Sequence, residues 1–122
     1  MMTGVVAFNE AVLHVRVSGI EEREKWIDVV IDTGFNGFLT LPAAFITDLM
    51  LPYVGSTRAT LADSNEVAMD VFEATVDWNQ QQRNVLVLST DGVPLVGMSM
   101  LSGHRVILDV EEGGSVTIEA LS

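Results

Sequence analysis

Short stretches of alternating or continuous apolar residues recur along the whole chain, and turn-forming residues separate them. This pattern is typical of β-strands, either half-buried or covered on both faces. No linker or low-complexity segment interrupts it, so we predict one mostly β domain spanning residues 1–122. The predicted strands are 5–8, 11–17, 26–32, 57–61, 67–77, 84–88, 105–110 and 115–120.

Two short helices and a tight turn are predicted between these strands. Pro42 can occupy the first turn of a helix through AAFITDLM, where its missing N–H costs nothing, and Pro52 lies just beyond the end. A single helical turn is predicted for 98–102, closed by Gly103. The sequence EEGG at 111–114 predicts a hairpin connection, because paired glycines supply the positive φ of tight β turns.

Charge and composition narrow the class of partner. The 122 residues carry 17 acidic and 6 basic side chains, a formal net charge of −11 that repels phosphate backbones and anionic lipids. We therefore predict neither nucleic-acid nor membrane binding. The N-terminus has no basic segment before its apolar residues, so a cytoplasmic location is expected. There is no cysteine, which excludes disulfides, thiolate metal sites and a cysteine nucleophile.

One carboxylate stands where burial is costly. The run VVI at 29–31 is typical of a strand covered on both faces, and Asp32, Thr33 and Gly34 follow it directly. An ionised carboxylate at the edge of a core is unfavourable unless it is hydrogen-bonded. About sixty residues later, the sequence LVG at 95–97 again places a glycine after an apolar strand, before a short helix.

This order resembles the retropepsin-like aspartic peptidases, in which a strand, Asp-Thr-Gly, a flap hairpin, two apolar residues and a glycine precede a short helix. The continuation as DTGF, with Phe35, is similar to a group of small prokaryotic members. The resemblance runs from Gly4 to Leu121. It implies an acid protease fold, a closed β barrel with one or two short helices, and it implies neither a cofactor nor a metal.

The resemblance also assigns roles to residues. Carboxylate-based peptide hydrolysis uses two carboxylates that share one proton, and this chain has one DTG, so a homodimer would bring two Asp32 side chains together on a two-fold axis. The Asp32 pair would activate a water against a peptide or protein substrate. Thr33 would hydrogen-bond across the pair, and Gly34 would present N–H groups to the carboxylate. Gly97 would let the strand containing Val96 pack behind the loop.

The flap is where the sequence departs from the viral pattern of this family. It is predicted as a hairpin between residues 57 and 77, and its tip lacks the glycines of viral flaps. Turn-forming residues stand there instead, with Ser64 at a position where closer relatives often carry glycine. Phe35 would place a large ring next to the site and narrow or close the cleft. The predicted tip consists of Ala62, Asp63, Ser64, Asn65 and Glu66.

Other interpretations of these residues stay open. The alternative function is that of a catalytically inactive dimer of the same fold that acts as a binding or scaffold protein. A simpler interpretation of Asp32 is that it is an ordinary residue at the end of a strand, without a catalytic role. His14 and His104 have no partner at metal-ligand spacing and are predicted to be surface residues. The segment 115–121 is predicted to form an exposed sheet edge, which would favour dimerisation.

Overall fold

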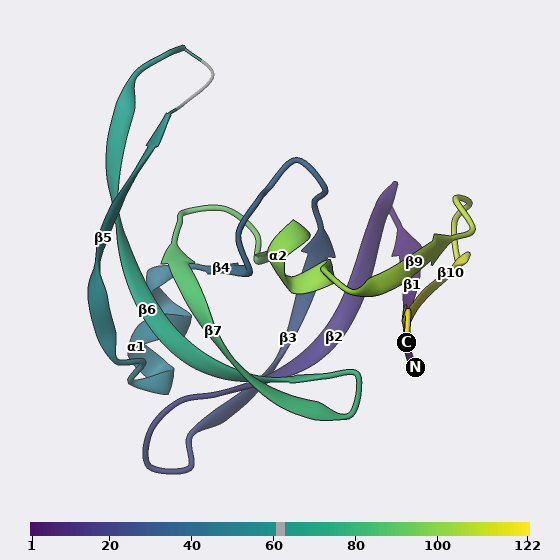
Figure 1. The fold of residues 1–122 in the computed structure, drawn as a ribbon, viewed down its shortest axis with the longest axis horizontal. Helices are drawn as coiled ribbons and strands as arrows, with labels where there is room; N and C mark the ends of the chain where they lie inside the picture. Colours follow the sequence, from purple (N-terminus) through teal and green to yellow (C-terminus); the bar gives the residue numbers. More distant parts are fainter. Residues whose placement is uncertain (61–62) are drawn as a thin grey trace.

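The computed structural model describes residues 1–60 and 63–122 and confirms the mostly β fold. Among these described residues, ten strands and two short helices follow one another along the chain (Figure 1). The strands are β1 (Met2–Ala7), β2 (Glu10–Ser18), β3 (Glu24–Ile31), β4 (Leu39–Leu41), β5 (Tyr53–Thr60), β6 (Glu66–Trp78), β7 (Gln81–Ser89), β8 (Leu95–Val96), β9 (His104–Leu108) and β10 (Ser115–Ala120). The helices are α1 (Ala43–Leu49) and α2 (Met98–Leu101).

The strands form one mixed sheet in the order β5-β6-β7-β4-β8-β3-β2-β1-β10-β9. β6 also pairs with β2, where Val17 faces Val76 and Ser18 faces Thr75. This pairing bends the sheet into a partial ring of six strands: β2, β6, β7, β4, β8 and β3. The β5–β6 hairpin projects from one side of the ring, and β1, β10 and β9 continue the sheet on the other (Figure 1).

Alternation along the strands builds the core. On β2, Leu13, Val15 and Val17 are buried while His14 between them is exposed, the period of two that one sheet face requires. Val29 on β3 lies opposite Leu13 and is also buried. Each such burial contributes about 1.5–3 kcal/mol, so the interior of the ring is the main source of stability.

The predicted helices and hairpin turn are confirmed. The first helix, α1, follows Pro42, and the second, α2, is followed by Gly103 with a φ of 83°. β9 and β10 are antiparallel, and Gly113 between them has a φ of 80°. In the described part of the chain no helix has the length and apolar character needed to cross a bilayer.

β4 was not among the predicted strands. Its three residues are buried between β7, with which it is parallel, and β8, with which it is antiparallel. Three residues are too few to show a period of two, so the local sequence does not identify this strand. Its pairing with β7 and β8 holds it in place. Thr40 at the centre of β4 is buried, with 3% of its surface exposed. Its hydroxyl accepts a hydrogen bond from the Leu95 N–H of β8 at 2.9 Å.

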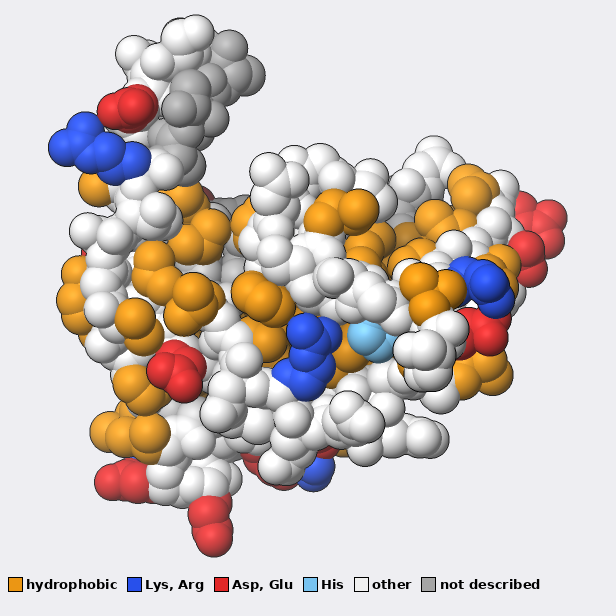
Figure 2. Space-filling view, in the orientation of Figure 1, with side chains coloured by type: hydrophobic (Ala, Val, Ile, Leu, Met, Phe, Trp, Pro, Cys, Tyr) orange, Lys and Arg blue, Asp and Glu red, His pale blue; other side chains and the backbone are white. Residues whose placement is uncertain are grey.

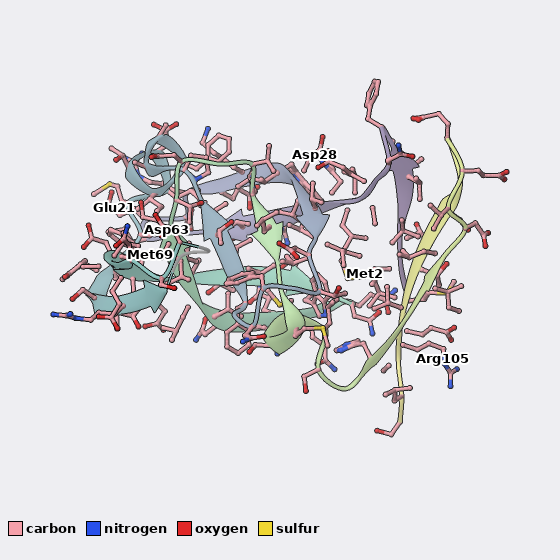
Figure 3. All side chains as sticks on the ribbon, turned by 90° about the horizontal axis from the view of Figure 1, so that it is seen from above. Met2, Glu21, Asp28, Asp63, Met69 and Arg105 are labelled. Atoms are coloured by element: carbon pink, nitrogen blue, oxygen red, sulfur yellow. The ribbon has the colours of Figure 1, made fainter. Side chains whose placement is uncertain are left out.

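The prediction that the C-terminal strand forms a sheet edge is wrong. β10 pairs with β1 on one side and with β9 on the other, so among the described strands the free edges are β5 and β9. Ile107 and Leu108 on β9 are 42% and 41% exposed. Figure 2 shows exposed apolar side chains over the α2, β9 and β10 region. The two edges lie far apart, because Asp63 and Met69 of the hairpin are at the opposite end of the molecule from Arg105 (Figure 3).

Candidate active site

The backbone holds Asp32 at the point where β3 leaves the sheet. Its N–H donates to the Val96 carbonyl at 3.0 Å, and its Oδ1 accepts a hydrogen bond from the Gly34 N–H at 2.9 Å. The Asp32 carbonyl accepts a further bond from the Phe35 N–H at 3.2 Å. Asp32 is half-buried while Thr33 is exposed. These bonds offset part of the desolvation of the carboxylate, which explains how it can follow a buried strand.

Two distant segments meet behind this loop. β8 lies between β3 and β4 and pairs in parallel with β3, so that Ile31 faces Val96. The structure therefore places Val96 and Gly97 directly behind Asp32. The Gly97 N–H donates to the Phe38 carbonyl at 3.1 Å, and the Ser99 N–H donates to the Gly37 carbonyl at 3.1 Å. The DTG loop and the start of α2 are joined as one unit.

Two glycines make room for the ring of Phe35. A Cβ added to Gly37 would lie 2.6 Å from the ring, and one added to Gly97 would lie 2.6 Å from the ring and 2.4 Å from the Phe35 carbonyl oxygen. The Phe35 carbonyl also accepts a bond from the Met98 N–H at 2.8 Å. The ring thus packs back onto its own loop and lines neither of the two cavities beside that loop. The expectation that Phe35 narrows or closes the substrate cleft stays a prediction.

An apolar groove of about 270 Å³ lies between the β5–β6 hairpin, which the sequence predicted as a flap hairpin, and the loop that follows Asp32. The loop contributes Gly37 and Phe38. The hairpin contributes Thr57 from β5 and Val71 from β6. The rest of the lining is Leu86, Leu88 and Ser99.

This groove was not predicted from the sequence, although the sequence of β7 carries a signal for it. Leu86 and Leu88 alternate on β7 with the buried Val85 and Val87, so this strand is apolar on both faces. An apolar residue on the outer face of a strand indicates a surface that something covers. Such a pattern shows that β7 has an exposed apolar face, but it does not show which segments of the chain lie opposite that face.

A second apolar cavity, of about 400 Å³, touches the DTG loop at Thr33. Its remaining walls come from α2 and the start of β9, including Met98, Leu101 and Val106. Thr33 and Met98 are both exposed, and the free edge of β9 begins beside them. This side of the loop therefore offers an apolar surface next to an unpaired strand.

The described part of the flap tip is closed by the side chain of Asp63. Its Oδ1 accepts from the Asn65 N–H at 3.1 Å, and its Oδ2 accepts from the Asn65 side-chain amide at 2.9 Å. Ser64 has a φ of 68°, the left-handed conformation that favours glycine. Glu66 is the first residue of β6, and Ala62 lies outside the described residues. Polar turn residues therefore occupy the described part of this tip.

The two histidines lie in different surroundings. His14 is exposed, as predicted, and stacks on Trp26 while its Nδ1 lies 2.7 Å from Asp28. His104 is half-buried against Trp78, which the prediction of a surface residue missed because the contact spans two distant strands. In the described ranges no group of three His, Cys, Asp or Glu side chains could hold a metal ion.

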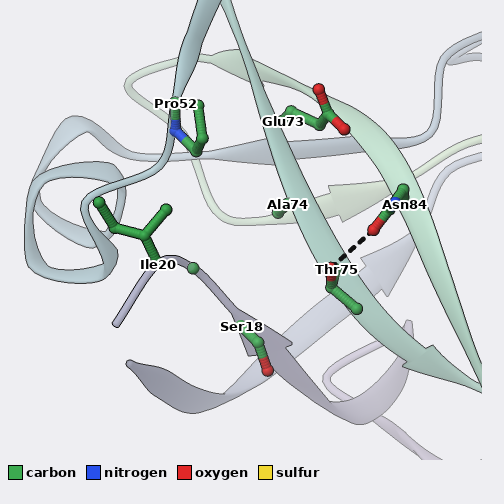
Figure 4. Close-up of a pocket in the computed structure, with 8 residues that line it drawn as sticks. Ser18, Ile20, Pro52, Glu73, Ala74, Thr75 and Asn84 are labelled. Atoms are coloured by element: carbon green, nitrogen blue, oxygen red, sulfur yellow. Dashed lines mark hydrogen bonds between the residues drawn. The ribbon is translucent and has the colours of Figure 1, made fainter. Parts of the chain in front are cut away.

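A third cavity, of about 180 Å³, lies beside the junction of β2 and β6. Ser18, Ile20 and Glu73 are among its lining residues, and the Thr75 hydroxyl donates to the Asn84 amide oxygen at 2.7 Å (Figure 4). No residue of the DTG loop reaches it. Of these three cavities, the two apolar ones flank the loop that begins at Asp32. No protein-family model matches the chain, and no curated protein matches it in sequence.

Proposed function

We propose that this protein is a retropepsin-like aspartic endopeptidase with an Asp32 pair at the two-fold axis of a homodimer. The observation that carries the proposal is the way Asp32 is held: β8 fixes its backbone, Gly34 donates to its carboxylate, and an apolar groove flanks its loop. A half-buried carboxylate whose loop continues into the wall of an apolar groove, at Gly37 and Phe38, has surroundings suited to acid–base catalysis.

The fold supports the same proposal. A partial ring of six strands is compatible with the closed barrel of the acid protease fold. The insertion of β8 between β3 and β4 supports the role that the resemblance gives Gly97, because a side chain there would collide with the Phe35 and Gly37 carbonyl oxygens.

Two Asp32 side chains perform the proposed reaction together. One is ionised and takes a proton from a water molecule, whose oxygen attacks the substrate carbonyl carbon. The other is protonated and donates to the carbonyl oxygen, giving a tetrahedral intermediate. The proton taken from water then passes to the amide nitrogen as the C–N bond breaks, and the second carboxylate recovers its proton. The two carboxylates share one proton because like charges at contact distance resist joint ionisation.

Dimerisation has support beyond the single DTG. Thr33 is exposed, an apolar cavity adjoins it, and β9 beside that cavity has an unpaired edge with Ile107 and Leu108 exposed. An unpaired apolar edge is a ready template for pairing with another chain. A second copy that covers this surface would bring its own Asp32 loop to the first.

The groove indicates where a substrate would lie. It is open between the flap hairpin and the DTG loop, and Val71, Leu86 and Leu88 give it apolar walls. An extended peptide with an apolar side chain fits such a surface, since the backbone can lie along the hairpin while the side chain is buried. We therefore expect cleavage next to apolar residues.

Cleavage of a mixed peptide library across roughly pH 3 to 8 tests the proposal. The wild type should cut with a bell-shaped pH dependence whose maximum is on the acid side of neutrality, because one carboxylate must be protonated and one ionised. Metal chelators should have no effect.

Asp32→Asn should lose at least about a thousandfold in activity, because an asparagine side chain can neither take a proton from water nor give one to the substrate. The matched control is Asp91→Asn, an exposed aspartate outside the site, which should cut like the wild type. A wild-type dimer that cuts nothing in this pH range would refute the peptidase and favour the binding or scaffold function.

A further inference from the structure

One carboxylate lies beside the apolar groove and has no role in the proposed proton transfers. Glu73 is on β6, directly opposite Leu86 on β7, and Leu86 lines the groove. Residues that face each other in an antiparallel pair point to the same side of the sheet, with their Cβ atoms about 4.5–5.5 Å apart. The side chain of Glu73 therefore begins next to the apolar wall of the groove, and Glu73 is itself exposed.

The face of the sheet that carries Glu73 changes from apolar to polar along the two strands. Three successive cross-strand pairs share this face: Val71 with Leu88, Glu73 with Leu86, and Thr75 with Asn84. The first pair and Leu86 line the groove. In the last pair the Thr75 hydroxyl donates to the Asn84 amide oxygen at 2.7 Å, so the opposed side chains do meet on this face (Figure 4). Glu73 thus lies where the apolar wall ends.

Glu73 has no positive partner in the described part of the chain. None of the ion pairs formed there includes this carboxylate. β6 and β7 together contain one basic residue, Arg83, which lies opposite Val76 and therefore on the other face of the two strands. The residues that line the groove are uncharged. This end of the groove therefore carries an uncompensated negative charge, in a chain of net charge −11.

A cavity next to Glu73 offers room for a long side chain. Glu73 lines the cavity of about 180 Å³ beside the β2–β6 junction, and the other described residues in that lining are uncharged. Ser18, Thr75 and Asn84 add hydroxyl and amide oxygens to its walls. Glu73 therefore adjoins an apolar groove on one side and a polar cavity on the other, and a cationic side chain suits this position.

We propose that the groove selects peptides with an apolar and a basic residue two positions apart, and that Glu73 binds the basic side chain. This inference rests on the proposed function, which makes the groove the substrate site. In an extended peptide that runs along β6, side chains two positions apart point to the same side at a spacing of about 7 Å, as Val71 and Glu73 do. An apolar side chain over Val71 and Leu88 would then place a lysine or arginine over Glu73.

Two short peptides test this selection by charge: acetyl-Lys-Ala-Leu-Ala-Lys-amide and acetyl-Glu-Ala-Leu-Ala-Glu-amide. Each has the same charged residue on both sides of the leucine, so the result does not depend on the direction in which the peptide lies. The backbone amide signals of Leu86 and Leu88 in ¹⁵N-labelled protein give the dissociation constants at about pH 7, where free carboxylates and lysine side chains are charged. All proteins carry Asp32→Asn, so the peptides are bound without being cut.

The lysine peptide should bind more tightly than the glutamate peptide, and Glu73→Lys should shift this preference toward the glutamate peptide. Glu10→Lys is the matched control, because Glu10 is an exposed glutamate at the start of β2 that lines neither the groove nor the cavity. Both variants change the net charge equally. The ratio of the two dissociation constants should shift at least about fivefold more in Glu73→Lys, since only there an attraction at the groove becomes a repulsion. Added salt should reduce this difference.

Should Glu73→Lys fail to fold, Glu73→Gln is compared with Glu10→Gln, and its preference for the lysine peptide should fall by about two- to fivefold. Equal ratios in the Glu73 and Glu10 variants, or no binding of either peptide, would overturn the inference. Cleavage of the same peptides by the protein with its native Asp32 is recorded separately. Selection by Glu73 without cleavage would support the inference and contradict the peptidase function, whereas cleavage with equal ratios would contradict the inference alone.

Discussion

At the scale of single residues, the site depends on glycines as much as on the aspartate. Gly34 donates its N–H to Asp32 and stands so close that a Cβ there would lie 3.2 Å from Oδ1. Gly37 and Gly97 leave the space that the Phe35 ring fills. The position of the carboxylate therefore follows from the small volume of its neighbours, because any larger residue would push the loop outward.

The thermal stability of Asp32→Asn distinguishes a catalytic role of Asp32 from a purely structural one. An asparagine Oδ1 can still accept the Gly34 N–H, and the change removes the repulsion within the proposed pair, so the melting temperature should stay equal or rise slightly. A purely structural carboxylate would instead lose about 1–3 kcal/mol with its charge-assisted bond. Thermal melting of both proteins, with the dimer checked by sedimentation, decides between them.

Gly97→Ala should damage the loop itself. The new Cβ would lie 2.4 Å from the Phe35 carbonyl oxygen and 2.5 Å from that of Gly37, so the backbone must move. We expect a loss of about 1–3 kcal/mol in the free energy of unfolding, measured by urea denaturation. Gly92→Ala is the control, because a Cβ there meets nothing within 4 Å. Equal stability of the two variants would show that the loop does not need its close contact with Gly97.

At the scale of elements, a few short strands hold the loop that carries the proposed catalytic aspartate. β8 has two residues and β4 has three, yet together they link β3 to β7 and hold the DTG loop from behind. The long β5–β6 hairpin supplies one wall of the apolar groove, and the DTG loop supplies the other. The elements that position the site are therefore the shortest and the longest in the sheet.

Ile107→Lys tests β9 as the pairing edge. A lysine on an edge strand opposes further strand pairing, since its charge would be desolvated in the interface. The dissociation constant of the dimer, measured by analytical ultracentrifugation, should rise by at least about tenfold. Val93→Lys places the same charge at a loop residue that is 58% exposed and should leave the dimer intact. A dimer equally stable in both variants would place the interface elsewhere.

At the scale of the whole molecule, charge opposes the proposed assembly. Each chain carries −11, so two chains that meet must overcome a long-range repulsion. In the proposed dimer, the attraction would come from the exposed apolar surface around β9. At 0.1 M salt, the repulsion between exposed charges that lie more than about 10 Å apart is largely screened. The free energy gained by burying apolar surface is not screened.

Added salt should therefore strengthen the dimer. Sedimentation velocity at low and high sodium chloride should show the fraction of dimer increasing with ionic strength, because screening removes repulsion and leaves the apolar contact. Arg58→Glu, which adds negative charge on the flap hairpin, should steepen this salt dependence. A chain that stays monomeric at high salt and high concentration would contradict the proposed site, since one chain has one DTG.

The local pattern of residues was sufficient to predict the mostly β fold, both short helices and the β9–β10 turn. Alternation identifies a strand and the face it buries, as Leu13, Val15 and Val17 show, because side chains on a strand point to opposite faces with a period of two. Asp32 and Gly97 could likewise be selected from their positions directly after apolar strands.

The partners of each strand were decided by the tertiary structure. Pairing between distant strands depends on contacts that local periodicity does not encode, so the sequence did not indicate that β9 would be the edge or that β4 would lie beside β8. For the same reason the groove and the fit of Phe35 between two glycines follow from the folded chain alone. Each of them joins segments far apart in the sequence, and only the three-dimensional packing brings their side chains within contact distance.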